Sequence, residues 1–161
     1  MAVDYILELD GITGESQDKD HKDKIDIESW SWGMTQSGTT HLGTGSGAGK
    51  VNVMDLSLTK IIDKSSPILM QYCTQGKHIA SGKLHCYKAS GDTRVKYLEF
   101  EMKNILVSSY QTGGSGGMDQ QMESLSLNFG EYKKIYTQQM ADGSAGSKVD
   151  FGWKIPVNEA W

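Results

Sequence analysis

The sequence predicts a mainly β fold: an antiparallel β-barrel of two curved sheets, with one flanking α-helix at about residues 67–75 and a long extended loop at about residues 35–50. Three observations lead to this prediction. Apolar and polar residues alternate over many short segments, which is the pattern of half-buried strands. A single segment carries both the start and the stop signals of a helix. The alternation also changes parity repeatedly, as it does in strands that bulge and curve.

The first predicted strand covers residues 3–10, where the odd positions are apolar and most even positions are acidic. Ile6 breaks the rule, which suggests that the outer face of this strand is also partly covered. Residues 11–24 are polar and charged and are expected to form a solvated connection. In the next predicted strand, apolar residues move from odd positions, such as Ile27, to even ones, such as Trp30. Either a bulge between these two residues or burial of both faces would produce that change.

The loop at about residues 35–50 separates this strand from the one predicted at 51–60. Two residues suffice for a hairpin turn, and a loop of this length in a compact domain is usually functional or disordered. We therefore expect the loop to reach out of the domain and touch another copy of the chain. Its candidate contact residues are Gly43, Gly45, Gly47, Gly49 and Lys50.

The predicted helix is marked by its ends. Ser66 is a suitable N-cap, Pro67 suits the first helical position, and Gly76 suits a left-handed C-cap. The helix is expected to plug or flank the barrel through an apolar stripe formed by Ile68, Leu69, Tyr72 and Cys73.

The remaining alternation predicts six further strands, at residues 79–88, 94–103, 104–112, 121–130, 131–139 and 149–157. A small-residue loop is expected at 141–148. Pro156 cannot donate a hydrogen bond to a ladder, so the last strand should end there or lie at an edge.

Composition excludes several classes of protein. The net charge is −4 and the basic residues are scattered, which argues against nucleic acid or an anionic membrane as the main partner. No apolar run approaches the roughly 20 residues that cross a bilayer. The N-terminal residues read as a strand and lack the features of a signal peptide. We expect the chain to fold in the cytoplasm with two reduced cysteines, Cys73 and Cys86.

Motifs for catalysis, cofactors or metals do not emerge, so no enzyme activity, cofactor or metal is predicted. The glycine run that ends at Lys50 fails the phosphate-loop spacing, because Thr44 stands where the first glycine is required and Val51 follows the lysine. The four histidines have no paired metal-ligand spacing and are expected to be solvated or at sheet edges.

Trp30 and Trp32 lie on one face of their predicted strand. Two such residues can stack on a sugar or a base, but large aromatic residues serve more often as anchors of a core or an interface, and we favour that interpretation. Ser31 points to the opposite face, where a small polar side chain suits a wet surface.

Several motifs together resemble the hemolysin-coregulated protein (Hcp) family, and the resemblance covers nearly the whole chain in order. The segments that carry it are GESQDKDH at 14–21, WSWGMTQSG at 30–38, the glycine loop before KVNV at 50–53, DKSSP at 63–67, VSSYQTGGSGG at 107–117 and FGWKIPVN at 151–158.

The resemblance implies one Hcp-like β-barrel domain over residues 1–161, without a C-terminal effector extension. It implies that six copies form a ring, and that rings stack into the inner tube of a type VI secretion system. The implied partners are further copies of the chain, the spike and sheath proteins of that system, and small effector proteins in the lumen, with Ser31 on the lumen wall. The chain would be assembled in the cytoplasm and secreted without a signal peptide when the sheath contracts.

Two alternatives remain open from the sequence. The first is a tail-tube protein of a phage-derived contractile particle, which would have the same fold and assembly. The second is a carbohydrate-binding β-sandwich that uses Trp30 and Trp32 as stacking platforms.

Overall fold

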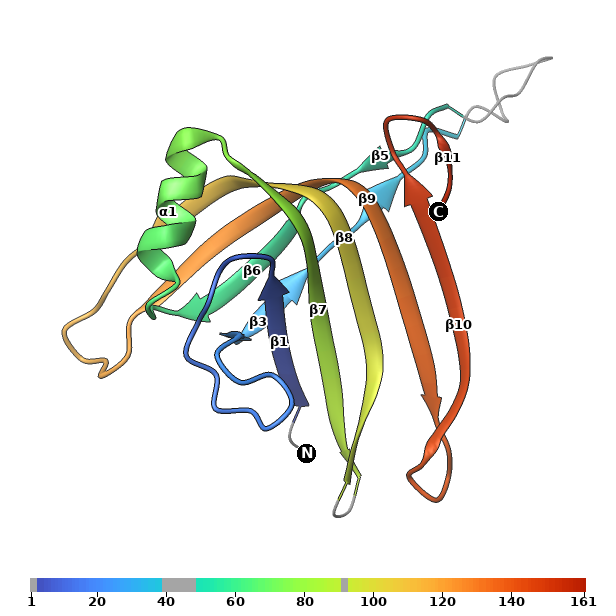
Figure 1. Ribbon diagram of the computed structural model, residues 1–161, viewed down its shortest axis with the longest axis horizontal. Helices are drawn as coiled ribbons and strands as arrows, with labels where there is room; N and C mark the ends of the chain where they lie inside the picture. The colour runs from blue at the N-terminus through green and yellow to red at the C-terminus, as the bar shows by residue number, and fades with distance from the viewer. Residues whose placement is uncertain (1–2, 39–48, 91–92) are drawn as a thin grey trace.

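The computed structural model describes residues 3–38, 49–90 and 93–161 (Figure 1). In chain order the elements are β1 (Val3–Leu9), β2 (Ile25–Ile27), β3 (Ser29–Ser31), β4 (Met34–Thr35), β5 (Asn52–Val53), β6 (Leu56–Ile61), α1 (Ser66–Gln75), β7 (His78–Ser90), β8 (Thr93–Thr112), β9 (Met122–Gln139), β10 (Ala145–Lys154) and β11 (Glu159–Ala160). The prediction of a mainly β fold with one flanking helix is confirmed for the described residues.

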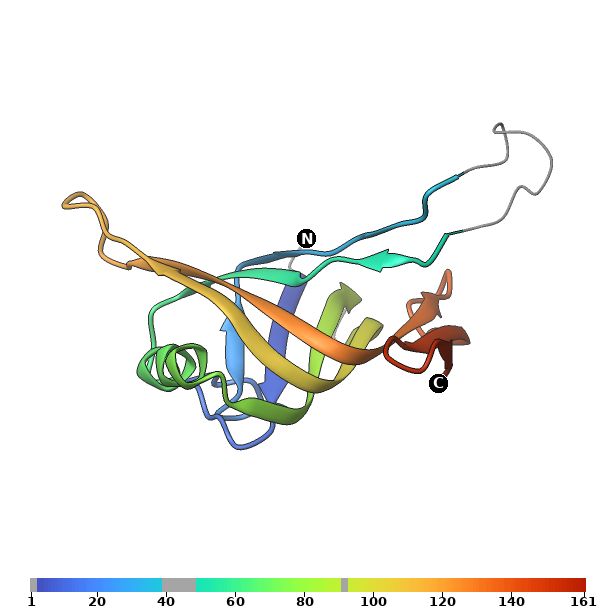
Figure 2. The same ribbon diagram turned by 90° about the horizontal axis from the view of Figure 1, so that it is seen from above.

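Nine of the described strands form one antiparallel sheet. Seven of them follow the order β11-β10-β9-β8-β7-β1-β2, and the other two join through β6, which pairs with both β9 and β3. The sheet curls strongly (Figures 1 and 2), and the side chains of its concave face form the hydrophobic core. The small β4–β5 pair forms a separate two-stranded sheet. The curved barrel is not closed, because among the described strands β2 pairs only with β1, β3 pairs only with β6, and the chain alone joins β2 to β3 at Glu28.

The parity change between Ile27 and Trp30 has a topological cause. Ile27 pairs with Tyr5 on β1, whereas Trp30 pairs with Leu58 on β6. Between them, the N–H of Glu28 donates to the carbonyl oxygen of Thr59 at 2.8 Å. The chain thus crosses from one edge of the sheet to the other at Glu28, and its apolar side chains face the core on both sides of the crossing.

The predicted breaks near residues 104 and 130 are wrong, since β8 and β9 run through them without interruption. Asn104 has a φ of 55°, which is the left-handed region. A Cβ on Gly130 would lie 3.3 Å from the Asn104 side-chain amide, so the two strands approach closely there. The parity changes mark a sharp bend in continuous strands. Similarly, part of the loop predicted at 141–148 belongs to β10, which ends at Lys154, before Pro156.

Helix α1 flanks one end of the curved sheet and contacts β8 (Figure 1). Gly76 ends it in the left-handed region (φ 60°) and its N–H donates to the Tyr72 carbonyl, as predicted. The predicted N-cap is wrong: the capping position is Ser65, which makes no side-chain cap hydrogen bond. The Ser66 hydroxyl instead accepts a hydrogen bond from the Asp63 N–H at 3.0 Å. Ser66 therefore starts the helix and serves a buried polar cluster.

That polar cluster lies inside an otherwise apolar core. The side chains of Lys60 and Glu123 have no exposed surface and form an ion pair. Ser66 donates to Glu123 at 2.6 Å, and the Tyr110 hydroxyl also donates to Glu123. Lys60 further contacts Asp63 at 2.9 Å. Because these residues come from β6, its following turn, α1, β8 and β9, the cluster fixes the helix against the sheet.

Candidate functional site

One face of the sheet is lined with hydroxyl groups. On β3 and β6, Ser31 pairs with Ser57, and Ser57 pairs in turn with Ser126 on β9. Ser126 pairs with Ser109 on β8, so a row of serines crosses four strands. Alternate residues of the same strands, such as Leu58, are buried on the other face. Strand alternation therefore produces a polar outer face directly behind the core.

This serine face is organised by side-chain hydrogen bonds at its centre. The Ser126 hydroxyl lies 2.6 Å from that of Ser109 and 2.7 Å from that of Ser108, which occupies a bulge of β8. Ser108 also donates to Asp55 at 2.6 Å, and Asn128 donates to the other oxygen of Asp55 at 2.9 Å. Ser31 lies in the same face and is exposed. The side chains of this surface are thus small and polar.

A two-limbed arm projects from the body of the domain (Figure 2). Met34 and Thr35 of β4 pair with Val53 and Asn52 of β5. At its base, the Trp32 indole N–H donates to the Met54 carbonyl at 2.9 Å. The arm is therefore tied to the core through Trp32.

The candidate contact residues of this arm are only partly described. Gly49 and Lys50 are exposed. A Cβ on Gly49 would lie 2.4 Å from the Ser37 hydroxyl, so the two limbs approach too closely there for a larger residue without a shift. Gly43, Gly45 and Gly47 lie outside the described residues.

An apolar strip at the β9–β10 end of the sheet is exposed. Tyr136, Val149 and Phe151 are 47%, 69% and 56% exposed, respectively. Val149 pairs with Tyr136, while Trp153, two residues beyond Phe151, pairs with the buried core residue Tyr132. The Phe151 and Trp153 rings are stacked with their centroids 6.2 Å apart. The side chains of the strip therefore lie on the same face of the sheet as the core, but beyond the residues that cover the core.

A groove of about 610 Å³ joins the arm to this apolar strip. Its walls include Met34 and Val51 from the arm and Phe151 and Trp153 from β10. The arm and the strip thus form one continuous surface.

Trp30 and Trp32 pack against the core, in agreement with their interpretation as anchors. Trp30 meets Tyr5 edge-on, with ring centroids 6.3 Å apart. Trp32 lies 4.9 Å from Phe100 and 5.2 Å from Tyr132 between ring centroids. This packing disfavours the carbohydrate-stacking alternative.

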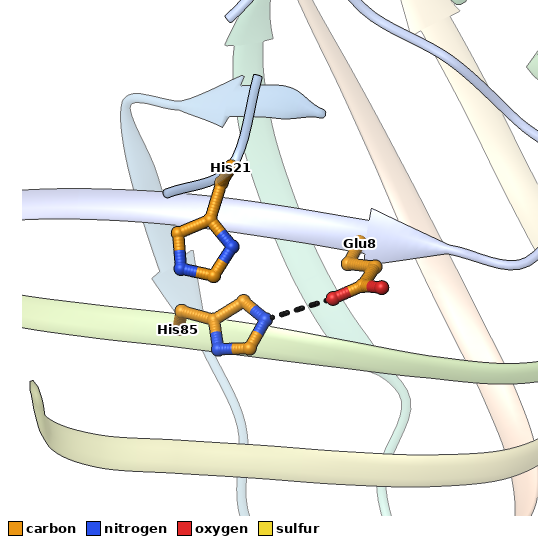
Figure 3. Close-up of side chains that lie close together, drawn as sticks. All are labelled: Glu8, His21 and His85. Atoms are coloured by element: carbon orange, nitrogen blue, oxygen red, sulfur yellow. Dashed lines mark hydrogen bonds and ion pairs between the residues drawn. The ribbon is translucent and has the colours of Figure 1, made fainter. Parts of the chain in front are cut away.

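A cluster of ionisable residues was not predicted by the sequence. His21, from the connection between β1 and β2, stacks on His85 of β7 at 4.3 Å between ring centroids, with Glu8 of β1 beside them (Figure 3). The prediction of solvated or edge histidines is wrong for His85, which is 3% exposed. Burial and the neighbouring His85 lower the pKa of His21. The only sequence signal was Ile6, an apolar residue on the outer face that the connection covers.

The helical part of the described chain lacks the length and apolarity needed to cross a membrane.

The fold and surfaces described above define a class: a β-barrel-like domain whose distinctive surfaces suit protein contacts. These surfaces are the hydroxyl-lined face of the curled sheet, its uncovered apolar strip and the adjoining arm. The profile of the family described as "Type VI secretion system effector, Hcp" matches residues 6–136. The chain belongs to this Hcp family.

Individual relatives agree with that assignment. "Protein hcp1" of Pseudomonas aeruginosa is 51% identical over 159 residues, which are 98% of each chain. A solved structure described as that of a type six secretion system protein has a TM-score of 0.93 and 31% identity, over 99% of this chain and 100% of the other. The crystal structure of Hcp1 from Salmonella typhimurium has a TM-score of 0.83 and 33% identity, and covers all of both chains.

Proposed function

We propose that the chain is the structural subunit of a type VI secretion tube: six copies close into a ring and rings stack into a hollow tube that holds small effectors. Its work depends on its assembled shape and not on a catalytic group. Membership of the Hcp family supports this proposal, and so does the uncovered apolar strip.

The apolar strip is the observation on which the proposal mainly depends. A monomeric soluble protein rarely leaves adjacent large apolar residues exposed without a partner. Full burial of a Val or Phe side chain stabilises a structure by about 1.5–3 kcal/mol. Covering Tyr136, Val149 and Phe151 with a second copy would therefore contribute substantially to association.

Ring closure follows from the kind of interface. When the strip of one copy meets a different surface of the next, the contact is heterologous, and repetition of such a contact closes a ring if the rotation allows it. β10 also lies near the end of the sheet, with only the two-residue β11 beyond it among the described strands. Such an edge is suited to pairing with another chain. The arm would add contacts to a neighbouring subunit or to the next ring through Gly43, Gly45, Gly47, Gly49 and Lys50.

Light scattering tests the ring. The wild-type mass should be near six times the 17.7 kDa of one chain. Phe151→Asp, at an exposed position of the strip, should shift the mass to that of a single chain while the circular dichroism spectrum remains unchanged. Ile68→Asp is the matched control, since Ile68 is 38% exposed on α1, away from the strip. A wild-type monomer at high concentration, or a Phe151→Asp variant that still forms hexamers, would contradict the proposal.

We also propose that the serine face lines the lumen and that Ser31 contacts cargo. A lining of small hydroxyl side chains would hold a folded effector through polar contacts and water without trapping it. Replacing Ser31 by tryptophan should leave the ring mass unchanged and reduce the amount of small effector that co-purifies with the ring. Ser81→Trp, at an exposed position of β7, is the control. Equal co-purification with both variants would remove Ser31 from the cargo contact.

The remaining partners follow from the same proposal. The tube would grow on the spike complex inside the sheath in the cytoplasm, and sheath contraction would carry it out of the cell. Removal of the sheath protein should abolish secretion of the chain without changing its cytoplasmic amount.

A further inference from the structure

Glu8, His21 and His85 form a compact group that the tube function does not use (Figure 3). Antiparallel pairing of β1 and β7 sets Ile6 opposite His85, and Glu8 lies two residues further along β1 on the same face. The connection between β1 and β2 places His21 over them. Each residue offers one atom that can bind a metal, and these atoms all lie within 4.8 Å of one another.

We propose that these three residues bind one divalent transition-metal ion of the Zn²⁺ type, which fastens the connection at residues 11–24 to the sheet. Two imidazoles and one carboxylate are a ligand set that binds Zn²⁺ and leaves a fourth position open. Mg²⁺ and Ca²⁺ prefer oxygen ligands, so two imidazoles select against them.

Half of the required geometry is already present. His85 Nε2 lies 3.2 Å from Glu8 Oε1. Bonds of 2.0–2.1 Å at a tetrahedral angle place two zinc ligands about 3.3 Å apart. Glu8 and His85 therefore need little adjustment to share an ion.

The second nitrogen of each histidine has a polar neighbour suited to a supporting role. His85 Nδ1 is buried without a hydrogen-bond partner, and its nearest acidic atom is Glu99 Oε1 at 3.4 Å. An ion on Nε2 would keep the proton on Nδ1, where it can be donated to Glu99. His21 Nε2 lies 2.5 Å from the Tyr87 hydroxyl, which leaves Nδ1 for the ion. Metal-bound histidines almost always have such a partner for the other nitrogen.

His21 is the residue that must move. Its ring is inclined by only 26° to that of His85, so the in-plane lone pairs of the two rings do not converge. A tilt of the His21 ring that keeps Nε2 beside the Tyr87 hydroxyl would bring Nδ1 toward the Glu8–His85 pair. This tilt does not disturb the sheet, because His21 lies in a connection whose backbone is held separately. The Asp18 carboxylate accepts hydrogen bonds from the backbone N–H of His21 at 3.1 Å and from the Arg94 guanidinium at 2.7 Å.

The ion can reach the group from solvent, since the Glu8 side chain is 39% exposed. Binding would stabilise the folded chain in proportion to the logarithm of the free metal concentration. It would link a mostly polar connection to β1 and β7. The proposal does not depend on ring assembly.

Calorimetric titration of chelator-treated protein with ZnCl₂ tests the site. The wild-type chain should bind one Zn²⁺, and the thermal midpoint should rise with Zn²⁺ but not with Mg²⁺. His21→Ala and Glu8→Gln should each weaken binding at least tenfold, while His78→Ala, at an exposed histidine of β7, should bind like the wild type. Co²⁺ in place of Zn²⁺ should give visible absorption bands that His21→Ala removes.

Two variants keep the test decisive. Circular dichroism establishes whether each variant folds. If His21→Ala does not fold, Glu8→Gln alone tests the site. The proposal is overturned if the wild-type chain binds no Zn²⁺. It is equally overturned if both variants bind as tightly as His78→Ala, because the affinity would then come from scattered surface histidines.

Discussion

Replacing Lys60 by methionine should destabilise the folded chain by about 3–5 kcal/mol, although the two side chains have similar length and volume. The Lys60 ammonium group has no exposed surface and donates to Glu123, to Asp63 at 2.9 Å and to the Ser66 hydroxyl at 3.2 Å. Methionine removes all of these contacts. Glu123 would keep only the hydroxyl donors of Ser66 and Tyr110, and its side chain has no access to water.

A graded series separates the charge from the packing. Glu123→Gln should cost less, about 1.5–3 kcal/mol, because Lys60 retains Asp63, whose side chain is 14% exposed and partly hydrated. The double variant Lys60→Met with Glu123→Leu should lose clearly less stability than the sum of the losses from Lys60→Met alone and Glu123→Leu alone. A buried pair replaced by apolar groups of similar volume is often nearly neutral, whereas a single buried charge left alone is not.

Urea unfolding followed by tryptophan fluorescence measures these differences. All variants must be compared at one protomer concentration, since association shifts apparent stability. A 3–5 kcal/mol loss should appear as a lower midpoint with an unchanged slope. A loss below about 1 kcal/mol for Lys60→Met would contradict the assignment of a charged, solvent-excluded pair. Strict additivity in the double variant would show that the two side chains do not interact.

Two further predictions follow from close contacts in the same domain. Burial and the hydrogen bond to Glu123 raise the pKa of Tyr110 to about 12. The folded chain therefore holds that proton when the unfolded chain has lost it, so Tyr110 contributes stability that declines as pH rises from about 10 to about 12. Tyr110→Phe should flatten this decline in urea unfolding across that range, and a decline as steep as that of the wild type would refute the assignment. Gly82→Ala should cost about 1–3 kcal/mol, because the new Cβ would lie 2.7 Å from the Leu9 side chain and 3.0 Å from the Glu8 carbonyl oxygen. Gly113→Ala, with no atom within 4 Å of the new Cβ, is its control in thermal unfolding, and equal midpoints for the two variants would contradict the tight packing.

Local patterns predicted those parts of the fold that depend on local chemistry. Alternation identified the strands, and the Pro67 and Gly76 signals identified the helix, because each is a property of a few adjacent residues. The parity changes also predicted the curvature correctly. They did not distinguish a bend at Asn104 from a strand end, since both change the face on which apolar residues lie.

The sites that depend on distant residues could not be predicted. His21 and His85 are separated by 64 positions, and Lys60 and Glu123 by 63. These residues come into contact because of how β1, β6, β7 and β9 are arranged, and that arrangement cannot be inferred from the spacing of the residues in the sequence. The prediction of Ser66 as the N-cap was wrong for the same reason. Its hydroxyl, which would suit a helix end, instead donates a hydrogen bond to Glu123 of β9.

The two departures from an ideal polar-out, apolar-in arrangement differ in what they require. The buried Lys60–Glu123 pair is compensated within the chain, since each charge finds the other and further donors or acceptors. The exposed strip of Tyr136, Val149 and Phe151 has no such compensation among the described residues, which cover only its Trp153 end. A polar group in the core needs only a few hydrogen-bonding atoms as partners, whereas an exposed apolar surface is removed from water only when another surface of comparable area covers it. The strip is therefore better explained by a partner surface than the buried pair is, and a second copy of the chain is the partner proposed above. The exposed surface therefore supports the proposed association of copies.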